Sequence, residues 1–143
     1  MPQVNKSALV PFSTSQMYKL VADVDAYQDF LPWCGHSEML SREGNVVVGT
    51  VTIAKGGVNK SFTTENYLQE NEYIEVKLVD GPFKRLDGFW RFEALKENAC
   101  KVTLNLEYEF SSKLLGMVVG PVFNQVANTM VDSFVKQARV AYG

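Results

Sequence analysis

Cysteine, histidine and net charge are all scarce in this sequence. Only Cys34 and Cys100 occur among 143 residues, so a disulfide scaffold is not expected and a reducing cytoplasm suits the chain best. The one histidine, His36, has no further metal ligands close to it in sequence. With 14 basic and 16 acidic residues, the net charge is −2. The sequence therefore predicts no metal site, no histidine-dependent catalytic residues and no general affinity for DNA.

Long apolar runs are also missing. The longest candidate, residues 117–123, is interrupted by Gly120-Pro121, whereas a membrane-spanning helix needs about 18 apolar residues. The first six residues contain no apolar signal core. What the chain does have is a globular composition, with 46% hydrophobic residues, 21% charged residues, 9 Phe, 6 Tyr and 2 Trp. We expect a single domain over residues 1–143 with a large apolar interior.

The N-terminal part predicts a strand, a helix and an ordered loop. Residues 3–10 are expected to form the strand. Ser13 and Gln16 have the spacing of a capping box, which predicts a helix that fades near Asp25. The aromatic-rich segment 27–36 contains a proline and is expected to be an ordered loop.

Residues 39–110 predict several antiparallel strands, because the hydrophobic period changes to two. In residues 100–110 every even position is apolar or aromatic and every odd position is polar or charged. One face of such a strand packs on a core while the other meets water. Turns are expected at Gly56-Gly57, at Glu70-Asn71 and at Asn98.

The C-terminal part predicts a long amphipathic helix over residues 121–141, with Pro121 in its first turn. Its length of about 32 Å is close to the length of about 37 Å for strand 100–110. The helix can therefore lie along the sheet, which predicts an α+β fold with two layers.

These elements resemble the START-like, or helix-grip, superfamily in its polyketide cyclase-like branch, and within it the coenzyme Q-binding subfamily. The most specific stretch is Gly81-Pro82-Phe83-Lys84-x-Leu86-x-Gly88-x-Trp90-x-Phe92. The other matching positions are residues 1–4, 7–13, 21–24 with Tyr27, 30–34 and 60–64, followed by Phe123, Met130, Val131, Phe134 and Ala138. Together they cover essentially the whole chain.

The resemblance implies a curved antiparallel sheet that grips the long C-terminal helix, with an apolar cavity between them. It also implies two functions that differ in kind. The first is non-enzymatic binding of ubiquinone or a related isoprenoid lipid, in the cytoplasm or at the inner membrane, with no required cofactor. The alternative is a ribosome-associating toxin that binds the large ribosomal subunit and blocks subunit joining. A polyketide cyclase-like enzyme is the third, and needs a polar group such as Asn66 inside the cavity.

For the first function, an isoprenoid tail is expected between the apolar faces of the strands and of the last helix. Each buried CH₂ group contributes about 0.8 kcal/mol, so such a site needs volume and a dry lining rather than one special residue. A completely filled core has the same periodicity and remains the alternative. The expected lining consists of Phe62, Leu78, Trp90, Phe92, Val102, Leu104, Leu106, Phe123, Val126, Met130 and Phe134.

The mouth of the cavity is expected at Phe30-Leu31-Pro32-Trp33 together with Phe83. Four consecutive apolar residues are unfavourable in water, so the loop either tucks over the end of the sheet or touches a membrane surface transiently. Opening of this loop would admit the tail.

Four basic residues, Lys55, Lys60, Lys84 and Arg85, fall at predicted strand ends or turns. They are either ordinary surface charge or contacts for ribosomal RNA phosphates. Clustering of these side chains at one end of the fold would favour the RNA contacts.

Overall fold

The computed structural model describes residues 2–143. Met1, which belongs to the expected domain and to the opening stretch of the resemblance, lies outside the described residues. The elements in chain order are β1 (Gln3–Val10), α1 (Thr14–Ala22), η1 (Val24–Ala26), α2 (Tyr27–Phe30), β2 (Cys34–Glu43), β3 (Val46–Lys55), β4 (Val58–Gln69), β5 (Tyr73–Asp80), β6 (Phe83–Lys96), β7 (Ala99–Phe110) and α3 (Lys113–Tyr142).

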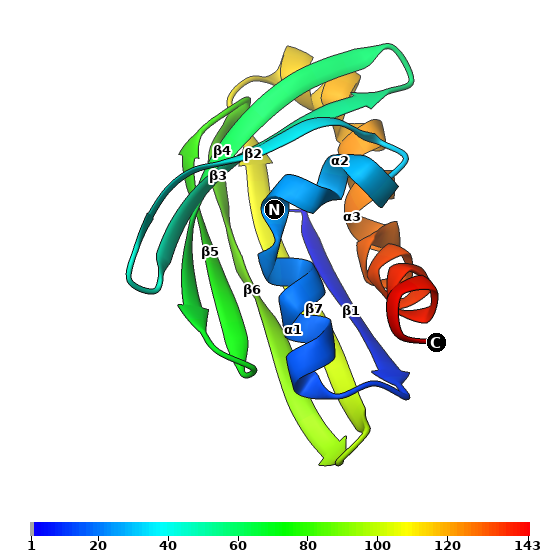
Figure 1. Cartoon of the computed structure of the whole chain (residues 1–143). Coiled ribbons are helices and arrows are strands. Elements are labelled where there is room, and N and C mark those ends of the chain that lie inside the picture. Colours follow the sequence, from blue (N-terminus) through cyan, green and yellow to red (C-terminus); the bar gives the residue numbers. More distant parts are fainter. Residues whose placement is uncertain (1) are drawn as a thin grey trace.

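All seven strands form one antiparallel sheet in the order β1-β7-β6-β5-β4-β3-β2. The sheet curves around α3, and α1 and α2 lie on the same concave side (Figure 1). In β7 the even residues from Cys100 to Tyr108 are buried and the odd ones are half-buried, as the alternation predicted. The three predicted turns are also present. The α+β helix-grip architecture is confirmed.

The predicted capping box begins α1. The Gln16 backbone N–H donates to Ser13 Oγ at 3.2 Å, and the Ser13 backbone N–H donates to Gln16 Oε1 at 2.9 Å. These bonds satisfy two donors that a helix start otherwise leaves open. They fix the helix so that Met17 and Val21 are buried against the sheet.

The segment 27–36 is more regular than the sequence predicted. Residues 27–30 form α2, and strand β2 already begins at Cys34, so only 31–33 remain a loop. The cause is tertiary: the Ala54 backbone N–H donates to the Trp33 carbonyl at 2.8 Å, which extends the β2–β3 pairing toward the loop. His36 is exposed as expected but lies on a strand, with Nε2 3.5 Å from a carboxylate oxygen of Glu38.

The last helix begins eight residues before the predicted start. Ser112 caps it by accepting a hydrogen bond from the Leu115 backbone N–H at 3.1 Å, and Pro121 lies inside the helix. Proline removes only the bond to the carbonyl of Met117, whose side chain is 75% exposed. Because that position faces solvent, water can hydrogen-bond the unpaired carbonyl and the helix continues.

Helix α3 is also long and apolar enough to cross a membrane, by length and composition alone. The sequence did not suggest this, because Gly and Pro divide its apolar residues into short runs. Core helices of soluble proteins pass the same test, and Phe123, Ala127 and Phe134 on the inner face of α3 are buried in the core.

Candidate ligand cavity and basic end of the sheet

An apolar cavity lies between the concave face of the sheet and the helices. Its free volume is about 90 Å³, enough for a few waters but well below the roughly 300 Å³ of a small ligand pocket. Six predicted residues line it: Phe62, Trp90, Leu104, Leu106, Phe123 and Met130. Eleven residues that were not predicted also line the cavity: Val21, Val24, Tyr27, Trp33, Gly49, Val51, Thr64, Asn66, Ile74, Val76 and Leu86.

The other five predicted lining residues lie outside this cavity: Leu78, Phe92, Val102, Val126 and Phe134. Helices α1 and α2 occupy part of the concave face, which periodicity in the strands alone does not reveal. The Phe134 ring lies 5.3 Å from the rings of Tyr27 and Trp90. Phe92 lies 5.9 Å from Tyr18 of α1. These aromatic side chains therefore fill space that an isoprenoid tail was expected to occupy.

An aromatic cluster packs beside the cavity, near the start of α3. The Phe123 ring is 4.9 Å from Phe83 and 4.7 Å from Tyr108, and Phe62 is 5.8 Å from Phe83. These tilted and edge-to-face contacts are favourable beyond the area they bury. Through Phe62 and Phe123 the cluster forms part of the cavity wall.

The largely apolar lining includes four residues with polar side-chain groups: Tyr27, Trp33, Thr64 and Asn66. The indole Nε1 of Trp33 is buried without a hydrogen-bond partner, although Trp33 lines the cavity. Thr64 donates through Oγ1 to Oδ1 of Asn66 at 3.1 Å, so the amide of Asn66 keeps its N–H donors. Trp33 and Asn66 thus carry hydrogen-bond donors that have no acceptor among the described residues. The expected polar side chain, Asn66, is among the lining residues.

No described side chain in the cavity is poised for acid–base or nucleophilic chemistry. The Tyr27 hydroxyl donates to the Val21 carbonyl, and burial, then Asp23 and Cys34, raise its pKa well above the usual range. Burial also raises the pKa of the Cys34 and Cys100 thiols, which disfavours the reactive thiolate. Over residues 2–143, no three His, Cys, Asp or Glu side chains group closely enough to hold a metal.

The expected mouth does not present an apolar edge to solvent. Leu31, Trp33 and Phe83 are buried, and Phe30 packs with its ring 5.5 Å from Phe134. Only Pro32 is exposed. The loop therefore tucks onto the core, because burying its aromatic side chains is more favourable than leaving them in water. Of the two alternatives for this loop, the structure has the tucked arrangement, and a membrane contact through it would require the loop to open.

The four predicted basic residues lie at the same end of the sheet. Lys55 ends β3, Lys60 lies near the start of β4, and Lys84 and Arg85 lie near the start of β6. The antiparallel order places these strand ends along one edge of the sheet, with β5 between β4 and β6. The Arg85 guanidinium forms ion pairs with the carboxylates of Asp87 and Glu107, and the nitrogen–oxygen distance is 3.1 Å in each. Among the described residues, the three lysines form no ion pair. Lys113, which on the sequence alone could equally face the ribosome, begins α3 at the same end.

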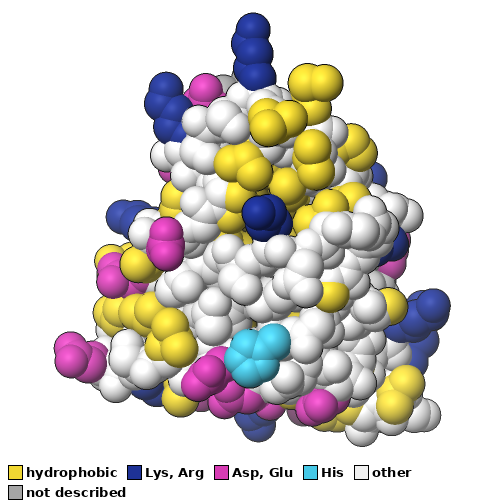
Figure 2. Space-filling model, turned by 90° about the horizontal axis from the view of Figure 1, so that it is seen from above, with side chains coloured by type: hydrophobic (Ala, Val, Ile, Leu, Met, Phe, Trp, Pro, Cys, Tyr) yellow, Lys and Arg dark blue, Asp and Glu magenta, His cyan; other side chains and the backbone are white. Residues whose placement is uncertain are grey.

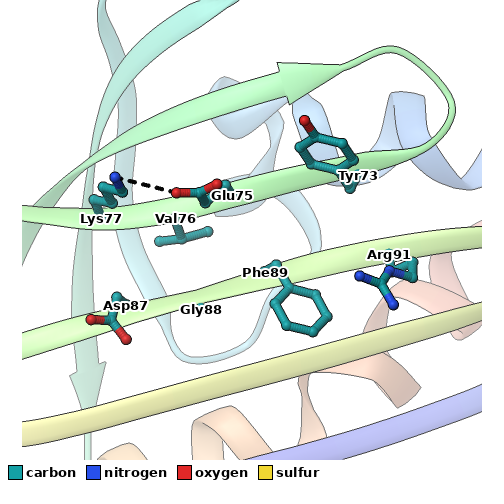
Figure 3. A pocket seen from close by; sticks show the side chains of 8 residues that line it. All are labelled: Tyr73, Glu75, Val76, Lys77, Asp87, Gly88, Phe89 and Arg91. Carbon is teal, nitrogen blue, oxygen red and sulfur yellow. Dashed lines mark ion pairs between the residues drawn. The ribbon is translucent and has the colours of Figure 1, made fainter.

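A separate groove of about 440 Å³ lies on the outer face of the sheet, between β5 and β6 (Figure 3). Its charges are balanced: Lys77 lies 3.3 Å from Glu75, and the Arg91 guanidinium lies 4.9 Å from the centre of the Phe89 ring. The groove is open to water and carries equal numbers of basic and acidic side chains, so it has no clear ligand chemistry.

A curved antiparallel sheet that grips a C-terminal helix around an apolar cavity defines a START-like protein. The chain belongs to the family described as polyketide cyclase/dehydrase and lipid transport, whose model matches residues 10–135.

Named relatives fall into two groups. The chain is 47% identical over 143 residues to the ribosome association toxin RatA of Vibrio cholerae, covering 100% of this chain and 99% of that protein. It is 30% identical over 145 residues to the mitochondrial coenzyme Q-binding protein COQ10 homolog B of Xenopus laevis, covering 99% of this chain and 59% of that protein.

A solved structure shows the same fold with a different chemistry. The Zhui aromatase/cyclase from Streptomyces sp. R1128 matches with a TM-score of 0.80 at 18% identity, covering 96% of this chain and 93% of that chain. At this identity the likeness concerns the fold alone.

Proposed function

We propose that this chain is a non-enzymatic protein that associates with the large ribosomal subunit and inhibits the joining of the two subunits. The observation that carries the proposal is the 47% identity, along the whole chain, to a protein named for ribosome association. The geometry supports it, because Lys55, Lys60 and Lys84 lie at one end of the sheet without ion-pair partners among the described residues. Such lysines are available to ribosomal RNA phosphates.

The absence of catalysis is part of this proposal. Catalysis by this fold needs a group inside the cavity that gives or takes a proton. The titratable side chain that lines the described cavity, Tyr27, is bonded to a backbone carbonyl, and burial raises its pKa. Asn66 can orient a substrate but cannot exchange protons near neutral pH.

Sucrose-gradient profiles after overexpression in a bacterial host test the ribosomal function. We expect free subunits to accumulate and the protein to sediment with the large subunit. Combined Lys55→Gln, Lys60→Gln and Lys84→Gln should reduce that association at least tenfold, because three phosphate contacts are lost. The matched control is Lys77→Gln, an exposed lysine on the outer face of β5. An unchanged profile with wild-type protein would refute the function.

Binding of a hydrophobic ligand in the cavity is the second candidate, and the unpaired Trp33 Nε1 favours it. A buried donor without an acceptor is unfavourable by about 1–3 kcal/mol, and a quinone carbonyl is a suitable acceptor. The free volume of about 90 Å³ means that a quinone has to displace side chains, with Met130, which is half-buried, the most adaptable of them.

Organic extraction of protein purified from a quinone-producing host, followed by mass spectrometry, tests the second candidate. We expect a quinone or isoprenoid at near-stoichiometric yield from wild-type protein. Trp33→Phe keeps an aromatic ring but removes the N–H donor, so its yield should be lower. An empty extract from the wild-type protein would remove this candidate and leave the ribosomal function unaffected.

A further inference from the structure

The solvent-facing side of α3 changes character along the helix. Leu114, Met117, Val118 and Pro121 are exposed and follow one another at i, i+3, i+4 and i+7, which places them on one face. The exposed fractions of the first three are 70%, 75% and 57%. Over residues 124–139 the exposed positions are polar, beginning with Asn124, Gln125 and Asn128, and exposed apolar residues return only near the end of the helix, at Val140. We call residues 114, 117, 118 and 121 the apolar stripe.

The core does not require the apolar stripe. The opposite face of the same turns already packs inside, where Gly116 and Gly120 let the helix lie against Phe110. A Cβ atom added at these glycines would lie 3.7 and 3.6 Å from the Phe110 ring. Val119 and Phe123 are buried beside them. Single exposed apolar residues are common, but a continuous row of them on one helix marks a contact surface.

Basic side chains border the apolar stripe. Lys113 begins α3 and lies one turn before Met117. Lys60 lies two residues before Phe62 and therefore on the same, concave face of β4. The β3–β4 turn reaches α3, because a Cβ atom on Gly56 would lie 3.4 Å from Val122. This turn brings Lys55 and Lys60 close to the helix.

Acidic side chains are few on this surface. Helix α3 contains no Asp or Glu before Asp132. Asp80 and Glu109 lie at the same end of the sheet, but Glu109 is opposite Arg85 in the β6–β7 pair. Seen from above, hydrophobic side chains gather over one part of this end, with basic side chains among and around them (Figure 2). The surface is therefore both apolar and positively charged, although the whole chain carries a net charge of −2.

We propose that the apolar stripe and its neighbouring lysines dock this protein onto an anionic lipid bilayer. Leu, Met and Val side chains gain free energy by entering the boundary between headgroups and acyl chains, and lysines at its edge gain from anionic headgroups. RNA phosphates would attract the lysines, but they have no apolar surface that the apolar stripe could contact. The docking surface is the start of α3, not the buried loop 30–33.

Vesicle flotation with the full chain tests the proposal. The probe is a vesicle of phosphatidylglycerol and phosphatidylcholine in equal parts, compared with phosphatidylcholine alone. We expect binding to the anionic vesicles that weakens as salt is added. Combined Met117→Ser and Val118→Ser should lower the partition coefficient about tenfold or more, through lost apolar burial. Lys113→Gln should lower it about fivefold and reduce the salt dependence.

The control variant is Val140→Ser, an apolar residue of the same helix that is 79% exposed but lies at its other end. It should bind vesicles like the wild-type protein. All substituted side chains are exposed, so far-UV circular dichroism should show an unchanged fold. Failure of wild-type protein to float with anionic vesicles would overturn the proposal. So would equal losses from the Val140 and Met117/Val118 variants, or a Met117/Val118 defect confined to ribosome sedimentation.

Discussion

Gly88 is the residue at which the sheet tolerates the least added volume. A Cβ atom there would lie 1.9 Å from the carbonyl oxygen of Asn105 on the neighbouring strand β7. Gly88→Ala should therefore lower the free energy of unfolding by about 3 kcal/mol or more, because backbone has to move. Urea denaturation measures the change. Gly116→Ala is the matched control: it meets only the edge of a ring at 3.7 Å and should be neutral or stabilising by up to about 1 kcal/mol.

Tyr27 should make stability depend on pH in alkaline solution. Burial raises the pKa of the Tyr27 hydroxyl in the folded state above the ordinary value of 10.0. As the pH rises, the hydroxyl therefore loses its proton in the unfolded chain before it does so in the folded chain. The contribution of Tyr27 to the free energy of unfolding is complete below about pH 10. It is lost as the pH rises further, and the free energy of unfolding then falls by at most about 1.4 kcal/mol per pH unit. Tyr27→Phe should flatten the decline in the free energy of unfolding above about pH 10, measured by urea denaturation. Parallel curves for both proteins would contradict this assignment.

Sequence patterns predicted the elements better than they predicted the cavity. Alternation in residues 100–110 identified β7 because one face is buried and the other is hydrated. The same alternation could not show that α2 brings Tyr27 to the cavity, or that Phe134 fills space beside it. Those facts depend on how elements pack, which no local pattern contains. The exposed row at Leu114 and Met117 was missed because the helix was expected to begin only at residue 121.

At the scale of the element, the start of α3 was misplaced because Pro121 suits a first turn. In the structure Pro121 is exposed and internal, so the Met117 carbonyl lacks its helical partner. Pro121→Ala restores that bond and should raise the free energy of unfolding by about 1 kcal/mol or more. Gln125→Ala, one turn later on the same exposed face, should change it by less than about 0.5 kcal/mol. A destabilised Pro121→Ala protein would mean that the proline adjusts the path of the helix.

At the scale of the whole molecule, one buried cluster includes residues from β1, α1, every strand and α3. No group of elements therefore has a core of its own, and cooperative two-state unfolding is expected for a chain of this size. The two tryptophans make this measurable. Trp33 and Trp90 come from distant segments, line the same cavity and are 4% and 5% exposed.

Their fluorescence should report the loss of the cavity, while far-UV circular dichroism reports the loss of the sheet and α3. We expect both signals to give the same urea midpoint and the same free energy of unfolding. An earlier fluorescence transition would mean that the cavity opens while the sheet persists, contradicting two-state unfolding. Such an opening would also be the route by which a ligand larger than the present free volume of about 90 Å³ enters. Coincident transitions would mean that the cavity opens only when the whole fold is lost, whereas separated transitions would give the free energy of opening the cavity alone.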